Sequence, residues 1–458
     1  MTYKNYSTAQ MQALDNAHYL HPDTDHKEIR EKNARIITRA EGPYIYDSDG
    51  HEMLDGMAGL WCVNIGYGRE ELAKAAYDQM LELPYYNSFF MCTTPSPILL
   101  AAKIAELAPD HMNEVFYGSS GSDANDTAIR MVRQYWALEE KPEKSIIISR
   151  HDAYHGSTIA AVSMGGMSGM QAQGGALLEG FRHVMCPYAF ENSWLDESDE
   201  DFGIRAAAAI EEEILKVGPE KIAAFVGEPI QGAGGVKIPP ANYWGEVQRI
   251  CQKYDILLML DEVITGFGRT GSWFAAESMN IKPDTMTVAK AITSGYQPLS
   301  AVIVGDRVAS TLVDKGGEFY HGYTYSGHPV ACAVALKNLE LIEQEGLVER
   351  VRDDTGPYFA ERLHAALDDH PIVGEVRTFG LMGAIEIVKD RDTRERFADD
   401  QNAALTIREI STRNGLIMRA VGSSMILSPP LIWTRETIDL AVERIVASFD
   451  EATKILLA

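Results

Sequence analysis

Helix-type and strand-type segments alternate along the chain from about residue 70. Apolar residues recur at helical spacing in 130–138 (RMVRQYWAL), 204–218 (IRAAAAIEEEILKVG) and 242–255 (NYWGEVQRICQKYD). Short apolar runs of the strand type occupy 144–150 (KSIIISR), 222–229 (IAAFVGEP), 256–262 (ILLMLDE), 285–291 (TMTVAKA) and 299–305 (LSAVIVG). Such alternation predicts an α/β fold, with a mostly parallel sheet covered by helices on both faces.

The pattern changes after the segment 321–329 (HGYTYSGHP). A long helical stretch spans 331–367, and two strand-like stretches follow at 372–388 and 415–433, before a final helix. This texture is typical of a smaller α+β unit. We therefore expect a large domain over 71–329 and a small domain over 330–458, which the N-terminal segment 1–70 joins. A chain of 458 residues also exceeds what one hydrophobic core usually serves.

The strand ends are the first places to look for chemistry, because ligands in such folds sit beyond the carboxyl ends of the strands. Asp261 follows five apolar residues in ILLMLD and is predicted to stand at one of these ends. A carboxylate in that position needs a cation or several hydrogen-bond donors. On this residue alone, a helix cap or a salt bridge explains Asp261 equally well.

A loop of small residues, GSSGS (118–122), precedes a helix whose apolar positions lie on one face. Those apolar positions are Ala124, Ala128, Met131, Val132 and Tyr135. Ser120 and Asp123 have the spacing of a capping box. Free backbone amides at a helix start form a ready phosphate site, although a well-capped helix explains the same residues. The segment matches neither a Walker loop nor a Gly-x-Gly-x-x-Gly fingerprint.

Lys290 lies in an apolar, small-residue segment 29 residues after Asp261 (290 − 261 = 29). A lysine held in an apolar pocket has a lowered pKa and carries free amine at neutral pH, which Schiff-base chemistry requires. The alternative is a lysine that extends its charge to water at a strand end. Together, a phosphate site, a strand-end aspartate and an apolar lysine are what pyridoxal phosphate needs: a phosphate site, an amine for its aldehyde and an acid for its ring nitrogen.

Composition narrows the class of protein. The formal net charge of −25 opposes binding to nucleic acid or to an anionic membrane. The chain shows neither a signal-peptide core at its start nor an apolar run of membrane-spanning length. The cysteines show neither a disulfide framework nor the spacing of a metal site, and we expect a soluble protein in a reducing cytoplasm. They are Cys62, Cys92, Cys186, Cys251 and Cys332.

The chain resembles the class III pyridoxal-phosphate-dependent aminotransferases of fold type I. Within that family it is most similar to the ω-amine:pyruvate branch, which includes putrescine–pyruvate aminotransferases. The similarity runs nearly end to end, and its motifs are specific for the family but much less so for the substrate. The matching stretches are DGMAGLWCVNIGYGR (55–69), LPYYNSFF (83–90), GSSGSDANDT (118–127), YHGSTIA (154–160), AFVGEPIQGAGGV (224–236), DEVITGFGRTG (261–271), YHGYTYSGHP (320–329) and GLIMRAVG (415–422).

The resemblance implies a role for each matching residue. Lys290 would bind the cofactor covalently and move the substrate proton, and Asp261 would pair with the ring nitrogen. Thr324 would reach the phosphate from the partner subunit, which makes the site a property of a homodimer, with a tetramer as the alternative. Remaining cofactor contacts implied by the resemblance are Ser120, Gly121, Ser122, Tyr154, His155, Glu228, Val263 and Tyr323.

The substrate pocket is implied in the same way. Leu60, Trp61, Phe89, Tyr154 and Ala233 would line it, and aromatic walls suit an apolar amine. Arg419 would hold the carboxylate of pyruvate, since a guanidinium binds a carboxylate through two hydrogen bonds. A structural salt bridge is the alternative role for Arg419. No metal site is expected.

The chain departs from the family pattern at Asp23, Asp123 and Ala291. Relatives often carry phenylalanine in place of Asp23, glutamate in place of Asp123 and glycine in place of Ala291. An acidic residue at the pocket mouth would favour a donor with a second amino group, such as putrescine. A solvent-facing aspartate in a mobile segment explains Asp23 equally well.

The resemblance implies transfer of an amino group from an amine or diamine to pyruvate, giving alanine and an aldehyde or ketone. Other class III specificities remain as alternatives: an ornithine or 4-aminobutyrate aminotransferase, an aminomutase or a decarboxylase. A non-catalytic regulator that binds the cofactor is a further alternative, but the chain shows no basic helix-turn-helix segment. The intact set of Lys290, Asp261, Thr324 and Arg419 speaks against a structural protein with a vestigial site.

Overall fold

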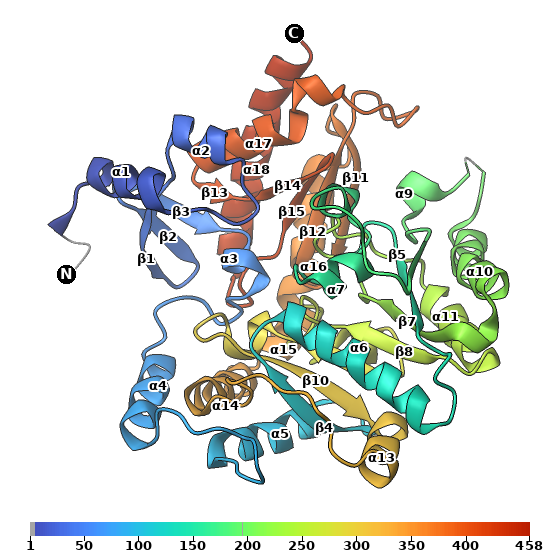
Figure 1. Ribbon diagram of the computed structural model, residues 1–458. Coiled ribbons are helices and arrows are strands. Elements are labelled where there is room, and N and C mark those ends of the chain that lie inside the picture. The colour runs from blue at the N-terminus through green and yellow to red at the C-terminus, as the bar shows by residue number, and fades with distance from the viewer. Residues whose placement is uncertain (1–4, 195) are drawn as a thin grey trace.

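The computed structural model describes residues 5–194 and 196–458, in which helices surround three β-sheets (Figure 1). The first four residues of the predicted segment 1–70 lie outside the described residues. Helices of the first half are α1 Thr8–His18, α2 His26–Lys32, α3 Ala58–Trp61, α4 Glu70–Glu82, α5 Pro95–Leu107, α6 Gly121–Leu138, α7 Ile159–Met164, α8 Ser168–Gln171, α9 Ala189–Asn192 and α10 Asp199–Val217. Later helices are α11 Tyr243–Lys253, α12 Ala275–Ser278, α13 Asp306–Lys315, α14 Pro329–Gln344, α15 Leu347–Arg350, α16 Gly356–Leu367, α17 Ala403–Arg413 and α18 Arg435–Leu456.

The central sheet has seven strands in the order β4-β10-β9-β8-β7-β5-β6. Strands β5 to β9 run parallel to one another, whereas β10 pairs antiparallel with β9 and β4. The predicted α/β class with a mostly parallel sheet is therefore confirmed. The strands are β4 Met112–Gly118, β5 Ile146–Arg150, β6 Phe181–Val184, β7 Ile222–Gly227, β8 Leu257–Asp261, β9 Thr285–Val288 and β10 Ser300–Gly305.

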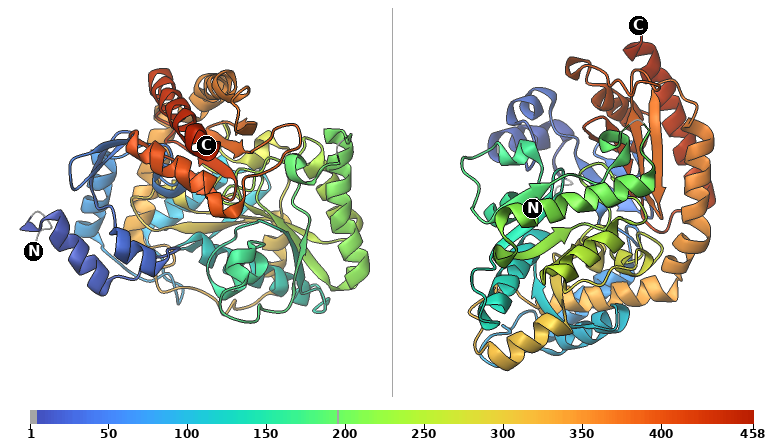
Figure 2. Two further views of the ribbon diagram at one scale, coloured as in Figure 1. Left: turned by 90° about the horizontal axis from the view of Figure 1, so that it is seen from above. Right: turned by 90° about the vertical axis from the view of Figure 1, so that its right-hand side faces the viewer.

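Both faces of this sheet are buried. In β8, Leu257 and Met259 join the core beneath α6 and α13, whereas Leu258 and Leu260 join the core beneath α5, α10, α11 and α14. Side chains alternate across a strand, so a strand that is apolar at every position is covered on both sides. Figure 2 shows these helix layers edge-on. The burial explains why the strands appear in the sequence as unbroken apolar runs.

Helix α6 begins as its sequence predicts. Ser120 is the N-cap: its hydroxyl accepts a hydrogen bond from the Asp123 amide at 3.3 Å, and the Asp123 carboxylate accepts one from the Ser120 amide at 2.9 Å. The capping box is confirmed, and the predicted apolar face is buried. Gly121 and Ser122 form the first helical turn, not the loop before it, because the cap lies at Ser120.

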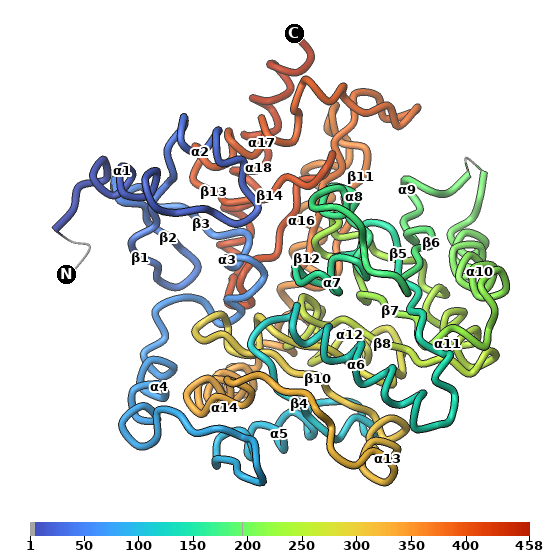
Figure 3. Tube along the Cα trace, in the orientation of Figure 1, coloured from blue at the N-terminus to red at the C-terminus, as the bar shows by residue number. Residues whose placement is uncertain are grey.

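The two ends of the chain share a sheet. Its order is β1-β2-β3-β13, and β13 from the C-terminal part lies parallel to β3. Figure 3 shows the N-terminal trace beside the C-terminal trace. A third sheet has the order β11-β12-β15-β14. The strands of these sheets are β1 Ile37–Glu41, β2 Tyr44–Asp47, β3 Glu52–Asp55, β11 Val373–Phe379, β12 Met382–Ile387, β13 Leu416–Ile417, β14 Arg419–Val421 and β15 Ser424–Leu427.

The division of the chain into domains stays a prediction. Helix α14, which would open the small domain at residue 330, packs against α4 and α5 at the edge of the large part. A boundary after Gln344 would describe this packing better than one at 330.

Of the helices in the described part of the chain, none has the length and apolar character needed to cross a bilayer. Likewise, residues 5–194 and 196–458 contain no group of acidic, histidine or cysteine side chains placed to hold a metal.

Candidate active site

A cavity of about 190 Å³ lies where the parallel strands end. Its walls come from the start of α6, the loop after β5 and the residues that follow β7, β8 and β9. Every predicted cofactor residue except Tyr323 and Thr324 lies on this wall. The lining residues are Ser120, Gly121, Ser122, Asn125, Tyr154, His155, Gly156, Glu228, Asp261, Val263, Ile264 and Lys290.

Lys290 enters the cavity from a short 3₁₀ helix, Lys290–Thr293, and not from a strand. The strand predicted over 285–291 ends at Val288, and Lys290 adopts a left-handed backbone with φ of 48°. Desolvation lowers the pKa of Lys290, and the positive charge of Arg419 lowers it further, against the opposing effect of the Cys62 thiol and of the Asp261 and Glu228 carboxylates. A lowered pKa raises the fraction of free amine, the form that attacks a carbonyl group.

Asp261 ends β8 and is 4% exposed. Its Oδ2 accepts hydrogen bonds from His155 Nδ1 at 2.8 Å and Asn125 Nδ2 at 2.9 Å, and its Oδ1 accepts one from the Val263 amide at 3.1 Å. Burial alone would raise the pKa of Asp261, but the hydrogen bonds and the charge of His155 hold it below its usual range. The carboxylate is therefore kept ionised inside the cavity, ready to hold a cationic group.

Asn125 is a site residue that the sequence analysis missed. It lies inside α6, is 1% exposed, and holds Asp261 while its Oδ1 accepts a hydrogen bond from Thr287 on β9 at 3.0 Å. Asparagine is a poor helix former, so a buried asparagine in a helix needs a specific partner. The sequence did contain a signal for Asn125: it is a polar residue next to the apolar face of a strongly amphipathic helix, where an asparagine is expected to be buried.

The start of α6 has the features of an anion site. Within the described chain, the amides of Gly121 and Ser122 donate to no backbone acceptor. A Cβ at Gly121 would stand 3.1 Å from Val263 Cγ1, so any larger residue would narrow the cavity. Ser122 faces the loop after β5, where its hydroxyl accepts a hydrogen bond from the Ser157 amide at 3.0 Å. Free amides at the positive end of a helix suit a phosphate.

These features fit the cofactor that the sequence resemblance implies. A phosphate would bind at the α6 amides, a protonated ring nitrogen at Asp261, and an aldehyde at the Lys290 amine. Tyr154 and Val263 both line this cavity and would contact the ring of the cofactor. Pyridoxal phosphate, when bound, supplies the electron sink that makes a proton on the substrate's amino-bearing carbon acidic.

Glu228 secures the wall beside Tyr154. Its carboxylate accepts hydrogen bonds from the amides of Tyr154 at 3.1 Å and Gly232 at 2.9 Å, and burial raises its pKa. Behind it lies Arg150, another buried residue that the sequence analysis did not single out. Its Nη2 donates to the Glu228 carbonyl oxygen at 2.6 Å, and the guanidinium lies over the rings of Tyr243 and Trp244.

The predicted substrate residues fall into separate groups. Trp61 and Ala233 are buried in one apolar cluster with Ile264, which lines the cavity. Leu60 is 54% exposed, and Phe89 is half-buried against Gly322 of the same chain. Arg419 opens β14, and its charge acts on Lys290. Of the predicted substrate residues, Tyr154 lines the cavity within one chain, whereas Leu60, Trp61, Phe89, Ala233 and Arg419 do not.

Tyr323 and Thr324 lie together on the segment after α13. The Tyr323 hydroxyl donates to the Asp123 carbonyl oxygen at 3.0 Å, close to the start of α6. Thr324 is exposed, and its carbonyl oxygen accepts a hydrogen bond from the Tyr85 hydroxyl at 2.6 Å. Neither residue lines the cavity of its own chain, and the role of Thr324 in a neighbouring subunit stays a prediction.

The covalent role of Lys290 leads to a direct test. Borohydride reduction of the cofactor-loaded protein should fix the cofactor mass to the peptide that contains Lys290. The Lys290→Ala variant should bind the cofactor only reversibly, so that dialysis removes it, and the peptide that contains position 290 should carry no label. The matched control is Lys282→Ala, an exposed lysine on the segment before β9. Label on another lysine in the wild-type protein would contradict the assignment of Lys290.

Solved structures of transaminases have the same fold as this chain. An (S)-enantioselective ω-transaminase from Thermomicrobium roseum matches with a TM-score of 0.95 and 42% identity, covering 98% of this chain and 99% of that one. The ω-transaminase of Pseudomonas jessenii in complex with PMP matches with a TM-score of 0.95 and 40% identity, covering 97% and 99%.

Sequence relatives extend over almost the whole chain. A putrescine–pyruvate aminotransferase from Pseudomonas aeruginosa is 50% identical over 454 residues, which is 99% of each chain. A diaminobutyrate–2-oxoglutarate transaminase from Halomonas elongata is 44% identical and covers 92% of this chain and 91% of its own. The family model of the class III aminotransferases matches residues 27–449. The chain therefore belongs to the class III aminotransferases and is a pyridoxal-phosphate-dependent transaminase of fold type I.

Proposed function

We propose that the protein moves an amino group from an amine or diamine to pyruvate, giving alanine and an aldehyde or ketone. The observation that carries the proposal is Arg419 at the start of β14, whose side chain is 32% exposed and so is open to a substrate carboxylate. A partly exposed guanidinium whose charge is felt at Lys290 offers a site for the carboxylate of a keto acid. The whole-length similarity to a putrescine–pyruvate aminotransferase supports pyruvate as the acceptor and a diamine such as putrescine as a donor.

In this proposal Lys290 carries the proton in both half-reactions. Its free amine would take the proton from the amino-bearing carbon of the donor and pass it to the cofactor, and with the keto acid it would move a proton from the cofactor to the substrate carbon, as general base and then general acid. Asp261 keeps its negative charge opposite the cofactor ring, while the Gly121 and Ser122 amides hold the phosphate. The buried hydrogen bonds of Asp261 and Glu228 orient these groups before substrate arrives.

The apolar cluster beside the cavity suits an aliphatic or aryl-alkyl donor. Trp61, Ala233 and Ile264 share this cluster, against which Tyr154 packs. Apolar walls with a few placed polar groups are typical of small-molecule sites. Acceptors such as 2-oxoglutarate, and the chemistry of an aminomutase or decarboxylase, are the competing specificities within the family, since one fold hosts several of these reactions.

We also propose a homodimer, with a tetramer as the alternative assembly. Large apolar side chains are exposed along α4, α5 and the two segments at 86–91 and 320–325. These residues, called here the apolar face, are Tyr77, Met80, Leu81, Tyr86, Phe90, Met91, Ile98, Leu99, Tyr320 and Tyr325. A contiguous exposed patch of this kind marks an interaction surface. Thr324 lies within it, so a second copy docked there would bring Thr324 towards a neighbouring site.

We propose the cytoplasm as the compartment, since all five cysteines are free.

The reaction type can be tested with one half-reaction at a time. Putrescine or 1-phenylethylamine, added without acceptor, should bleach the absorbance of the bound cofactor, and pyruvate should restore it and yield alanine. Restoration by 2-oxoglutarate but not by pyruvate would overturn the proposed acceptor. Turnover of an amine to product without any keto acid would overturn transamination itself and favour an aminomutase or decarboxylase.

The acceptor site can be tested at Arg419. Arg419→Ala should raise the KM for pyruvate by about 10- to 100-fold, as expected for loss of hydrogen bonds to a charged group. The half-reaction with an amine that lacks a carboxylate should change much less. Arg408→Ala, an exposed arginine on α17, is the control. An unchanged KM for pyruvate in Arg419→Ala would contradict the proposed role.

The dimer can be tested on the apolar face. Phe90 is 90% exposed in the single chain, so a charged residue there should not disturb the fold. Phe90→Asp should shift the protein from dimer to monomer in sedimentation velocity and lower its affinity for the cofactor. The control is Leu215→Asp, which replaces an exposed apolar side chain on α10, away from the apolar face. It should leave the mass of the assembly in solution unchanged. A wild-type monomer with full activity would contradict the shared site.

A further inference from the structure

Arg419 has an ion-pair partner on the N-terminal segment. Its Nη2 lies 3.8 Å from Asp23 Oδ2. In the part of the chain that the structure describes, Asp23 is the one carboxylate within ion-pair distance of this guanidinium. The two side chains come from opposite ends of the sequence, and they meet because the N-terminal sheet includes β13, two residues before Arg419.

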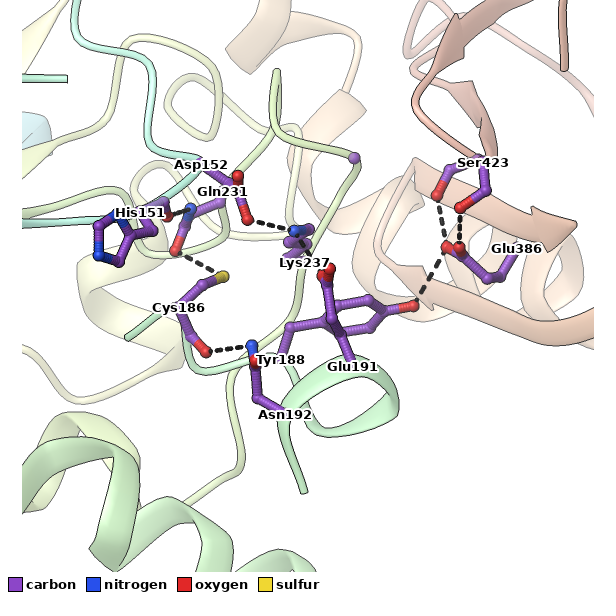
Figure 4. A network of polar contacts seen from close by, with 12 residues as sticks. His151, Asp152, Cys186, Tyr188, Glu191, Asn192, Gln231, Lys237, Glu386 and Ser423 are labelled. Atoms are coloured by element: carbon purple, nitrogen blue, oxygen red, sulfur yellow. Dashed lines mark hydrogen bonds and ion pairs between the residues drawn. The ribbon is translucent and has the colours of Figure 1, made fainter. Parts of the chain in front are cut away.

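The backbone of Arg419 is fixed. Strand β14 pairs with β15, which places Arg419 opposite Ile426, and β15 pairs in turn with β12. The turn between β14 and β15 is tied down by Ser423 and Ser424, whose hydroxyls donate to the buried carboxylate of Glu386. Figure 4 shows Glu386 accepting the bond from Ser423 and facing Tyr188. A rigid backbone leaves the long arginine side chain as the part that can move.

Arg377 further stabilises Glu386 and connects it to the loop after β7. Arg377 pairs with Glu386 at 3.2 Å and donates to the carbonyl oxygens of Gly235 at 2.6 Å and Val236 at 2.9 Å. That loop also carries Ala233 of the apolar cluster. The strand of Arg419 and the loop of Ala233 are therefore joined through one buried ion pair.

Asp23 is held differently. It lies in the turn between α1 and α2, with a left-handed φ of 49°, and the Thr24 hydroxyl closes the turn on the Pro22 carbonyl oxygen at 2.8 Å. Asp25, two residues on, caps α2. The Asp23 side chain is 92% exposed and that of Arg419 is 32% exposed. The contact is therefore solvated and loose, which allows another carboxylate to replace Asp23.

We propose that Asp23 is a specificity-determining residue that occupies Arg419 when no substrate carboxylate is present. The inference rests on the proposed function, in which Arg419 binds the keto acid. Keto acids and amino acids must displace Asp23, because both carboxylates pair with the same guanidinium charge. Amines without a carboxylate leave the pair intact, so the arginine charge stays compensated beside an apolar donor. Asp23 thereby weakens the binding of substrates that carry a carboxylate, relative to the binding of simple amines.

The test is Asp23→Asn. Asparagine tolerates the left-handed backbone as aspartate does, so the variant keeps the turn and removes only the charge. The KM for pyruvate and for L-alanine as donor should fall by about two- to fivefold, the range of an exposed ion pair. The KM for 1-phenylethylamine should stay the same. Glu31→Gln is the matched control, since it removes an exposed carboxylate from α2 without touching Arg419.

A double-mutant cycle separates this inference from the proposed function. In an Arg419→Ala background, Asp23→Asn should have no further effect on the KM for pyruvate. An unchanged KM for pyruvate in Asp23→Asn, while Arg419→Ala alone raises it, would overturn the inference and leave the proposed function standing. Equal changes for pyruvate and 1-phenylethylamine would overturn it as well. If Arg419→Ala had wild-type kinetics for pyruvate, that result would instead contradict the proposed acceptor site at Arg419.

Discussion

A buried ionised carboxylate must be compensated, and the groups that compensate Asp261 assemble the site. His155 from the loop after β5, Asn125 from α6 and the Val263 amide after β8 all donate to it. Unpaired buried charge is far more costly than the hydrogen bonds that relieve it, so these segments are held in one arrangement. The start of α6, with its free amides, is thereby placed a fixed distance from Lys290.

The same principle joins the site to the C-terminal part of the chain. Glu386 is 1% exposed, and its charge is compensated by Arg377 and the hydroxyls of Ser423 and Ser424. Lys237 extends the network on the other side, between Asp152 and Glu191 (Figure 4). The loop that carries Ala233, after β7, and the turn that follows Arg419, in the C-terminal sheet, are thus held together by the buried ion pair of Glu386 and its hydrogen bonds, as a site built from two parts requires.

Local patterns gave the parts of the site that depend on neighbours in sequence. The capping box of Ser120 and Asp123 and the strand-end position of Asp261 follow from spacing alone. Lys290 was identified, but its 3₁₀ helix was mistaken for strand, because the small residues around it suit either form. Asn125 and Arg150 were missed, since their partners lie on other elements. Asp23 and Arg419 were each noted, yet no local pattern could indicate that residues so far apart in sequence form an ion pair.

The central claim is that one cavity places the Lys290 amine, the Asp261 carboxylate and the α6 amides around a single pyridoxal phosphate. An experimental structure of the cofactor-loaded protein tests it most directly. The account predicts continuous density between Lys290 Nζ and the cofactor, the ring nitrogen hydrogen-bonded to Asp261, and the phosphate at the amides of Gly121 and Ser122. A cofactor bound elsewhere, or one whose ring nitrogen faces away from Asp261, would contradict it.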